Sequence, residues 1–139
     1  NDHFYSESHY ADGEKHGEHK YWFDNGQLRQ RQVFVNGVVY GQVEIWYKSG
    51  ERAGLKHWNN GELHGLQTEY YLTGGTMMET YYDDGEAHGS HVHYYENGQI
   101  MKVGNYWCNI KVGEWTSFFA NGQVERKRSI YEPKWPWWL

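Results

Sequence analysis

The chain has 139 residues, of which 38% are hydrophobic, 19% aromatic and 22% charged, and its formal net charge at pH 7 is −5. This length fits one domain with a small, aromatic core. Its single cysteine excludes an internal disulfide framework and a cysteine-based zinc site. The negative charge argues against nucleic-acid binding, which needs lysine and arginine to displace counterions from phosphates.

After a short β-rich segment at residues 4–10, the sequence repeats itself every 24 residues. Two complete columns of glycine keep this spacing: Gly17, Gly41, Gly65, Gly89 and Gly113, and Gly26, Gly50, Gly74, Gly98 and Gly122. A third column holds Gly13, Gly37, Gly61 and Gly85, and then Asn109. Because asparagine tolerates positive φ better than most residues, the exception indicates a left-handed backbone at this column. The period predicts an array of about five repeats.

Aromatic residues keep the same 24-residue spacing. Three columns contain them: Trp22, Trp46, Tyr70, Tyr94 and Phe118; Phe23, Tyr47, Tyr71, Tyr95 and Phe119; and Tyr10, Phe34, Trp58, Tyr82 and Tyr106. Side chains alternate along a strand, so neighbours such as Tyr94 and Tyr95 are expected on opposite faces of a sheet. One ladder is then expected to fill a core while the other lines a groove or an exposed surface, and the pattern leaves open which is which.

Each repeat reads as two short β-rich runs separated by turns. Asn25-Gly26, Asn97-Gly98 and Asn121-Gly122 are typical of two-residue hairpin turns. The other turn, for example from Asp84 to Gly89, is expected to be longer and to end on its second glycine. The ten glycines of the complete columns are therefore interpreted as structural turn residues. The predicted fold is all-β, an elongated antiparallel β-hairpin meander that forms a single twisted sheet.

The repeat array is expected to occupy residues 1–131 and to be followed by a Trp/Pro-rich tail, residues 132–139. The prolines exclude a central strand there, so Trp135, Trp137, Trp138 and Leu139 are expected to fold back as a cap on the last hairpin. Docking of this tail to a partner or to a membrane interface is the alternative.

No run of apolar residues reaches the length of a membrane span, which predicts a soluble, cytoplasmic chain, with a removed signal peptide as the alternative.

Three segments carry a resemblance to a known family: HWNNGELHGLQTEYYLTGG (57–75), YDDGEAHGSHVHYYENGQI (82–100) and NYWCNIKVGEWTSFFANGQV (105–124). They resemble the MORN-repeat variant, whose unit has an aromatic residue, a turn glycine, a second glycine after three residues, a short strand with paired aromatics, and Asn-Gly. The resemblance extends over roughly residues 8–128. It implies a protein-binding role, as in the bacterial YwqK-like antitoxin or immunity proteins, or a dimerisation scaffold, and a lipid-binding role has also been proposed for MORN arrays.

Histidines are the first candidates for chemistry. His16, His64 and His88 share one column before the second glycine, and a hydrogen bond from imidazole to the loop backbone is their expected role. His91 and His93 lie two residues apart on one strand face, about 6.6 Å from each other. Glu69 and Gln67 occupy the matching columns of the preceding repeat, so a metal cluster is geometrically conceivable. An exposed polar strand face gives the same pattern, and we predict no metal and no cofactor.

No catalytic motif stands out. Asp83 and Asp84 are interpreted as turn residues that bond their own backbone. Cys108 aligns with Asp84 and is interpreted in the same way. There is no phosphate loop, no Gly-x-Ser-x-Gly and no dinucleotide fingerprint. The sequence therefore predicts a protein that is not an enzyme.

The middle of the chain is acidic and aromatic. From His57 to Met101 there are seven acidic residues and no lysine or arginine. The negative charge of such a surface would accelerate association with a basic protein partner, for example a toxin. The aromatic side chains would supply the anchor residues of the interface. The predicted contact residues are Trp46, Trp58, Glu69, Tyr70, Tyr71, Glu79, Tyr81, Asp83, His91, His93, Tyr94 and Tyr95. The alternatives are a scaffold that forms homodimers and a cell-wall carbohydrate-binding repeat; neither nucleic acid nor a membrane is an expected partner.

Overall fold

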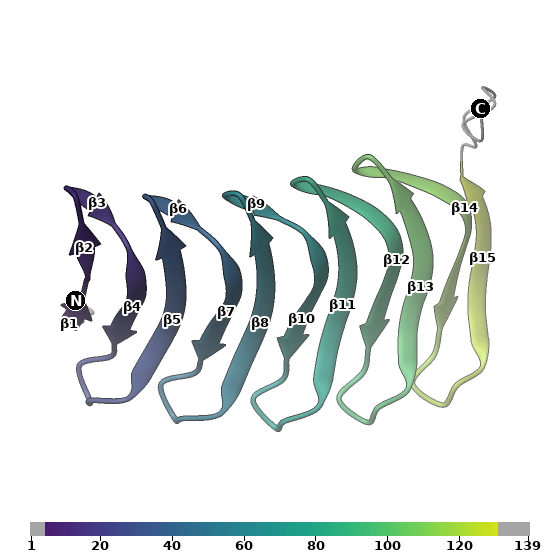
Figure 1. Cartoon of the computed structure of the whole chain (residues 1–139). Coiled ribbons are helices and arrows are strands. Elements are labelled where there is room, and N and C mark those ends of the chain that lie inside the picture. The colour runs from purple at the N-terminus through teal and green to yellow at the C-terminus, as the bar shows by residue number, and fades with distance from the viewer. Residues whose placement is uncertain (1–4, 131–139) are drawn as a thin grey trace, which may run out of the picture.

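The computed structural model describes residues 5–130, and this part of the chain is one long row of antiparallel strands (Figure 1). The strands are β1 (Tyr5–Glu7), β2 (Tyr10–Ala11), β3 (Glu14–Lys15), β4 (Gly17–Trp22), β5 (Leu28–Val35), β6 (Val38–Val39), β7 (Gly41–Trp46), β8 (Arg52–Asn59), β9 (Glu62–Leu63), β10 (Gly65–Tyr70), β11 (Thr76–Asp83), β12 (Glu86–Tyr94), β13 (Ile100–Trp107), β14 (Ile110–Phe118) and β15 (Val124–Ile130). The predicted cap at residues 132–139 lies outside the described residues.

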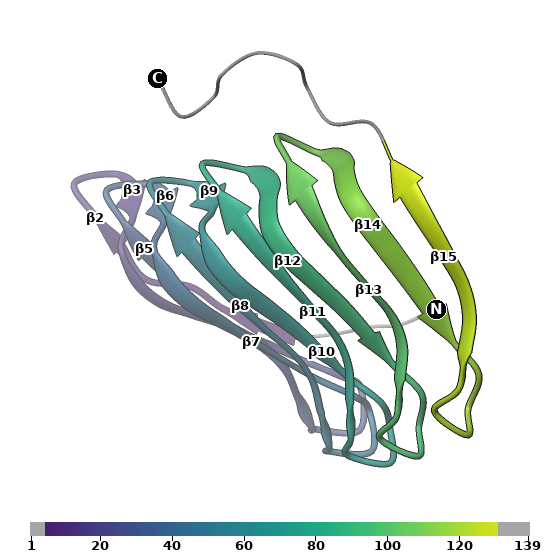
Figure 2. The same ribbon diagram turned by 90° about the vertical axis from the view of Figure 1, so that its right-hand side faces the viewer.

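Thirteen of these strands form a single sheet. Its order is β1-β4-β5-β7-β8-β10-β11-β12-β13-β14-β15, with β6 paired to β5 and β9 paired to β8, while β2 and β3 form a separate two-stranded ribbon. Nearly every strand pairs with its neighbours in the chain, and the two views show hairpins stacked side by side along one axis (Figures 1 and 2). The predicted all-β hairpin meander is confirmed. Within residues 5–130 there is no helix long and apolar enough to cross a membrane.

The two-residue turns do not lie where the Asn-Gly dipeptides predicted them. Asp12 and Gly13 join β2 to β3, and both have positive φ, 51° and 81°, as a type I′ turn requires. The equivalent turns are Asn36-Gly37, Asn60-Gly61, Asp84-Gly85 and Cys108-Asn109. Asn109 has a φ of 68°, which confirms the left-handed backbone that its column indicated.

The Asn-Gly turns are longer, and the prediction of two residues is wrong there. Between β4 and β5, Phe23 N donates to Gln27 O at 2.8 Å and Gly26 N donates to Phe23 O at 3.0 Å, so the chain reverses over three residues. Asn25 accepts the N–H of Gln27 through Oδ1 and donates through Nδ2 to the carbonyl of Lys48 in the next repeat, both at 2.9 Å. The asparagine thus keeps a negative φ and serves as a link between repeats, which a dipeptide signal cannot reveal.

The second glycine of each repeat either begins a strand or lies inside one. Gly17 begins β4, whereas Gly89 and Gly113 lie inside β12 and β14. All ten glycines of the two complete columns have positive φ, between 68° and 115°. At residue 89 an added Cβ would also lie 3.3 Å from the Cβ of Tyr81, so the neighbouring strand leaves little room for a side chain.

The sheet has two faces that the strand register defines. Residues directly opposite each other on paired strands share a face, and His19 lies opposite Gln32 while Gly17 lies opposite Phe34. We call this the His19 face; its central column is His19, Val43, Gln67, His91 and Trp115. The opposite side is the Trp22 face, and its aromatic column is Trp22, Trp46, Tyr70, Tyr94 and Phe118.

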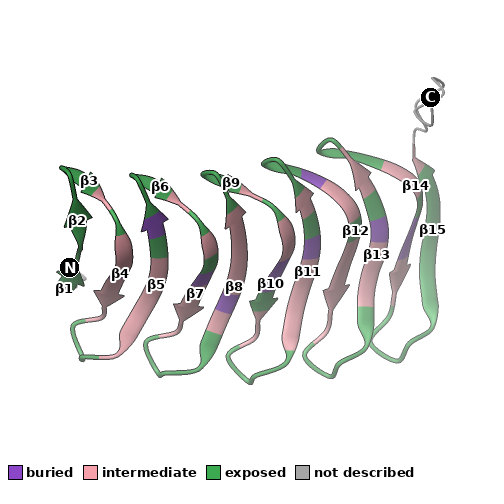
Figure 3. Cartoon of the chain, in the orientation of Figure 1, coloured by how far each residue is buried: buried purple, intermediate pink, exposed green. Residues whose placement is uncertain are grey.

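The core is a stripe along the middle of the sheet and not an enclosed interior. The central column of the His19 face contains the most buried side chains, with His19 at 0% exposure, Val43 at 3% and Trp115 at 5%. Phe34 is buried beside His19, with ring centroids 4.7 Å apart, while the aromatic column of the Trp22 face is half-buried throughout. Figure 3 shows buried residues as short bands within the strands and exposed residues at the turns. The predicted alternation of neighbouring aromatics is wrong, because Phe23, Tyr47, Tyr71, Tyr95 and Phe119 lie just past the strand ends, at the three-residue turns. Neither of the two paired aromatic columns fills the buried stripe.

Tyrosine hydroxyls connect successive repeats. Tyr47 donates to the carbonyl of Tyr70 at 2.5 Å, and Tyr71 donates to that of Tyr94 at 2.5 Å. Tyr95 makes the same bond to the carbonyl of Phe118 at 2.7 Å. In the three central repeats, this aromatic column therefore supplies a hydrogen bond from each repeat to the next.

Candidate functional site

The predicted contact residues are divided between the two faces of the sheet. By strand alternation, Trp46, Tyr70, Glu79, Tyr81, Asp83 and Tyr94 lie on the Trp22 face. Trp58, Glu69, His91 and His93 lie on the His19 face, and Tyr71 and Tyr95 lie at the three-residue turns, where they hold the repeats together. The set does not form one continuous surface, because neighbouring residues of a strand point in opposite directions.

The type I′ turns form an edge of the sheet on which acidic side chains gather. We call it the turn edge; its central acids are Glu62, Asp83, Asp84 and Glu86, all exposed. Stacking of the turns brings acids of consecutive repeats together, and an added Cβ on Gly85 would lie 3.8 Å from the Cβ of Glu62. In the described part of the chain, none of these four acids has an ion pair with lysine or arginine. Their negative charge is therefore presented to the solvent.

Several acids of the N-terminal repeats that lie away from the turn edge are paired with cations. Glu44 contacts both Arg31 and Arg52 on the Trp22 face. Asp24 lies 2.7 Å from the Nζ of Lys48, and the hydrogen bond from that ammonium group lowers the pKa of the Asp24 carboxyl. Asp12 and Glu14, on the turn edge of the first repeat, have no such partner within residues 5–130, so unpaired acids occur along the turn edge in the first, third and fourth repeats.

An apolar hollow lies on the same turn edge. Val35, Asn36, Val38, Tyr40 and Asn60 line it, and its volume is about 350 Å³. Val35, Val38 and Tyr40 are exposed, Tyr40 by 51%. Sequence reasoning missed this hollow, although a signal was present: Tyr40 stands in the column where three other repeats have histidine, and Val38 stands where three have glutamate.

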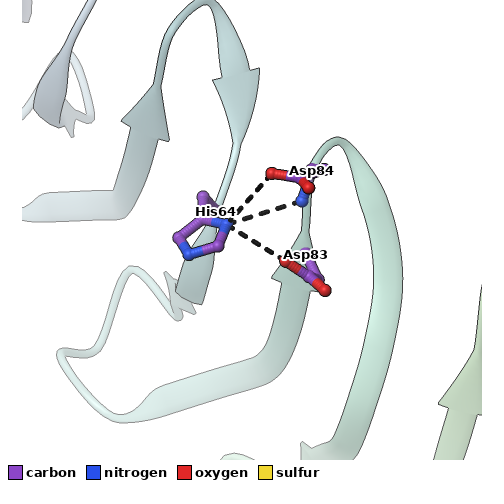
Figure 4. A group of neighbouring side chains, drawn as sticks. All are labelled: His64, Asp83 and Asp84. Carbon is purple, nitrogen blue, oxygen red and sulfur yellow. Dashed lines mark hydrogen bonds and ion pairs between the residues drawn. The ribbon is translucent and has the colours of Figure 1, made fainter.

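The histidines of that column bond the turn of the next repeat, as predicted. The Nδ1 of His16 accepts the backbone N–H of Asn36 at 3.3 Å, and that of His88 accepts the N–H of Cys108 at 3.3 Å. His64 accepts the N–H of Asp84 at 3.5 Å, and the carboxylates of Asp83 and Asp84 lie 3.4 and 3.7 Å from the same nitrogen (Figure 4). Each imidazole therefore secures a backbone that must adopt positive φ.

His64, Asp83 and Asp84 are the one group of potential metal ligands that converges within residues 5–130. All three are exposed, and the nitrogen of His64 that would bind an ion is directed at the backbone of Asp84. The arrangement therefore has a structural role. Within residues 5–130, His91 and His93 do not form such a group with Glu69. The Nδ1 of His91 lies 2.6 Å from the Oγ1 of Thr80.

Cys108 does not have the environment of a nucleophile. Its thiol lies in a type I′ turn, with the Nδ1 of His88 at 3.9 Å. Partial desolvation, followed by the carboxylates of Glu86 and Asp83, raises the pKa of this thiol. A raised pKa disfavours the thiolate that nucleophilic attack requires.

Comparison with protein families identifies the repeat. The family described as MORN repeat variant matches residues 15–36, 63–84, 87–107 and 111–130. The chain belongs to this family, which makes it a repeat scaffold or binding module. Residues 39–60 continue the same hairpin pattern in the structure, through β6, β7 and β8.

Other comparisons say little about function. No curated protein matches the chain. Among solved structures, a chain of "Crystal structure of GtfA/B complex bound to UDP and GlcNAc" is similar, with 15% identity and a TM-score of 0.36 over 91% of this chain. The match spans 24% of that chain, and a likeness at this level carries no argument about activity or ligands.

Proposed function

We propose that the protein binds a basic protein partner without catalysing a reaction, and that it acts as an antitoxin or immunity protein that covers the partner's functional surface. One observation carries this proposal: the turn edge combines uncompensated acids with an exposed apolar hollow. Protein interfaces join apolar anchor positions to a charged rim in the same way.

The two components of the turn edge have different physical roles. Glu62, Asp83, Asp84 and Glu86 create a negative field that accelerates the approach of a basic partner and weakens as salt is added. The hollow around Tyr40 offers apolar area whose burial stabilises the complex once it has formed. Association is therefore expected to be fast and salt-dependent, and dissociation is expected to depend on the apolar contacts.

The scaffold role of the reactive groups supports a non-enzymatic function. Imidazoles of the histidine column accept backbone N–H groups, and the Cys108 thiol has a raised pKa. The candidate catalytic side chains thus already have structural partners within the described residues.

A co-expression experiment tests the proposal. The protein is expressed with the product of the neighbouring gene, and growth, complex formation and salt dependence are measured. Glu62→Lys combined with Asp83→Lys is expected to reduce affinity roughly a hundredfold, mainly through the association rate. The matched control is Glu96→Lys combined with Glu125→Lys, which makes the same change in net charge at exposed positions away from the turn edge.

Equal effects of the two double variants would contradict the proposed surface, because only the total charge would then matter. A neighbouring gene product that neither inhibits growth nor binds would contradict the antitoxin role. Tyr40→Ala tests the apolar component independently of charge, and a faster dissociation rate is the expected result.

Self-association as a scaffold is the second candidate. β15 pairs with β14 on one side only, and six of its seven residues are exposed. An exposed edge strand is a template for pairing with another chain, although charged side chains on the edge oppose it. A particle larger than one chain in light scattering, unchanged by Glu62→Lys with Asp83→Lys, would favour this function over the first.

A further inference from the structure

A second, smaller hollow lies at the C-terminal end of the His19 face, away from the turn edge. It measures about 120 Å³, and its lining residues are Lys102, Lys111, Trp115, Ser117, Arg126, Arg128 and Ile130. The strand register explains why they meet: Lys102 is opposite Ser117, Ser117 is opposite Arg126, and Trp115 is opposite Arg128. We call this group the basic hollow.

Within the described residues, the cations of the basic hollow have no acidic partner. Arg126, Lys127 and Arg128 are consecutive, but only Lys127 points to the Trp22 face, where its Nζ lies 3.8 Å from Glu114. Across residues 5–130, no carboxylate lines the hollow, and no ion pair forms with its four cations. The positive charge of the hollow also acts on His91. Burial lowers the pKa of His91 most, and the positive charges of His93, Lys111 and Lys102 lower it further.

The hollow exists because two columns of the repeat change their residue type here. Ser117 stands where earlier repeats have Tyr21, Ile45, Glu69 and His93, so a small hydroxyl replaces a large side chain. Gly104 stands where they have Gln32, Lys56 and Thr80. Without a side chain on Gly104, the ring of Trp115 lies directly over the backbone, since an added Cβ would come within 2.1 Å of it.

Trp115, which lines the hollow, is itself almost completely buried. Trp115 is 5% exposed, and its Nε1 is buried without a hydrogen-bond partner in the described chain. Buried donors are nearly always satisfied in native proteins. One face of the indole is covered by Gly104, and the Nζ of Lys111 lies 4.7 Å from the ring centroid, so the ring is not free to stack on a nucleobase.

We propose that the basic hollow binds a small phosphate-bearing anion of the size of inorganic pyrophosphate. Guanidinium groups donate in a planar fork that matches phosphate oxygens, and lysines add charge without directional constraint. Ser117 supplies a neutral donor, and the covered Trp115 ring favours recognition of the phosphate group over recognition of a base. This site goes beyond the proposed protein-binding function and does not depend on it.

Calorimetric titration with pyrophosphate at constant ionic strength tests the site. Saturable binding with one equivalent per chain is expected for the wild-type protein. Arg126→Gln should weaken it roughly tenfold, which corresponds to the loss of one charge-assisted contact. Lys127→Gln is the matched control, because it removes the same charge from the neighbouring residue on the opposite face.

A second variant separates the hollow from the general charge. Ser117→Tyr restores the residue type found in the first repeat, leaves every charge in place and fills the cavity. It should abolish pyrophosphate binding while thermal unfolding shows a folded protein.

Three results would overturn the proposal. One is the absence of saturable binding at millimolar pyrophosphate. Another is an equal loss of pyrophosphate affinity in Arg126→Gln and Lys127→Gln, which would mean that the net positive charge attracts the anion without a defined site. The third is binding only to vesicles of anionic phospholipid, with no binding of free pyrophosphate at the same ionic strength.

Discussion

The turn edge of the central repeats and the basic hollow of the last repeats are built on the same 24-residue frame, yet they carry opposite charge. Among residues 5–130, Glu62, Asp83, Asp84 and Glu86 at the turn edge have no lysine or arginine partner, whereas the four cations of the basic hollow have no acidic partner. The backbone is equivalent in both regions. A repeat scaffold thus fixes glycine and aromatic positions and leaves the remaining columns free to carry different chemistry at different points along the array.

The largest effect is expected from a substitution that disrupts the packing beneath the basic hollow. Gly104→Ala places a Cβ about 2.1 Å from the Trp115 ring, which must move from its buried position. We expect a loss of about 3 kcal/mol in the free energy of unfolding, measured by urea denaturation. Gly75→Ala is the control, because nothing lies within 4 Å of an added Cβ there. If both variants were equally stable, Trp115 would not pack on Gly104.

The next effect concerns the turn edge. Gly85 has a φ of 86° in a type I′ turn, and Gly85→Ala is expected to destabilise the protein by about 1–2 kcal/mol because a Cβ disfavours the left-handed region. In the last repeat the same column contains Asn109, at a φ of 68°. Asn109→Gly relieves this backbone but removes the bond that Asn109 Oδ1 accepts from Ala87 N at 2.8 Å, so a net loss of about 1 kcal/mol is expected in thermal unfolding. An unchanged or higher melting temperature would show that the left-handed backbone outweighs the side-chain bond.

A smaller effect tests how the two regions are joined. Tyr71→Phe removes the hydrogen bond to the carbonyl of Tyr94, and we expect a loss of about 1 kcal/mol in unfolding free energy. Phe23→Tyr offers the reverse change in the repeat that lacks this hydroxyl, and it should stabilise the first interface. Tyr40→Phe is the control, since Tyr40 is exposed and its hydroxyl has no partner in the described residues. Identical losses of unfolding free energy in Tyr71→Phe and Tyr40→Phe would show that the hydroxyl of Tyr71 does not stabilise the contact between repeats.

The smallest expected effect depends on pH. Burial, aided by His93, Lys111 and Lys102, lowers the pKa of His91 in the folded protein, so the unfolded chain binds a proton more readily. The stabilising contribution is complete above the ordinary histidine pKa near 6.5 and is lost as the pH falls from there toward the lower folded value. The slope of unfolding free energy against pH between about 7.5 and 5 should be flatter in His91→Gln than in wild type. His9→Gln controls for removal of one histidine, and an unchanged slope in His91→Gln would contradict the role of burial.

The sequence predicted the fold well, and the contact residues that it suggested remain a prediction. Columns of glycine and aromatic residues were sufficient for the hairpin array, because each repeat meets the same local requirements as the next. Turn lengths were misassigned, since Asn25 bonds both Gln27 and the next repeat, and the latter contact is invisible in the sequence of one turn. The histidine column was correctly interpreted as turn chemistry. The apolar hollow around Tyr40 and the basic hollow were missed because each draws residues from several strands.

What the sequence by itself determined is the periodic scaffold: positive φ at the glycines of its three columns and at Asn109, and antiparallel hairpins in a single sheet. These are local consequences of steric limits and of the two-residue period of a strand. Tertiary structure alone decided which side chains share a surface. Arg126 and Arg128 face Lys102 across two strands while Lys127 points away, and Glu62 meets Gly85 one repeat later, because the register between strands, and not the distance along the chain, brings charges together.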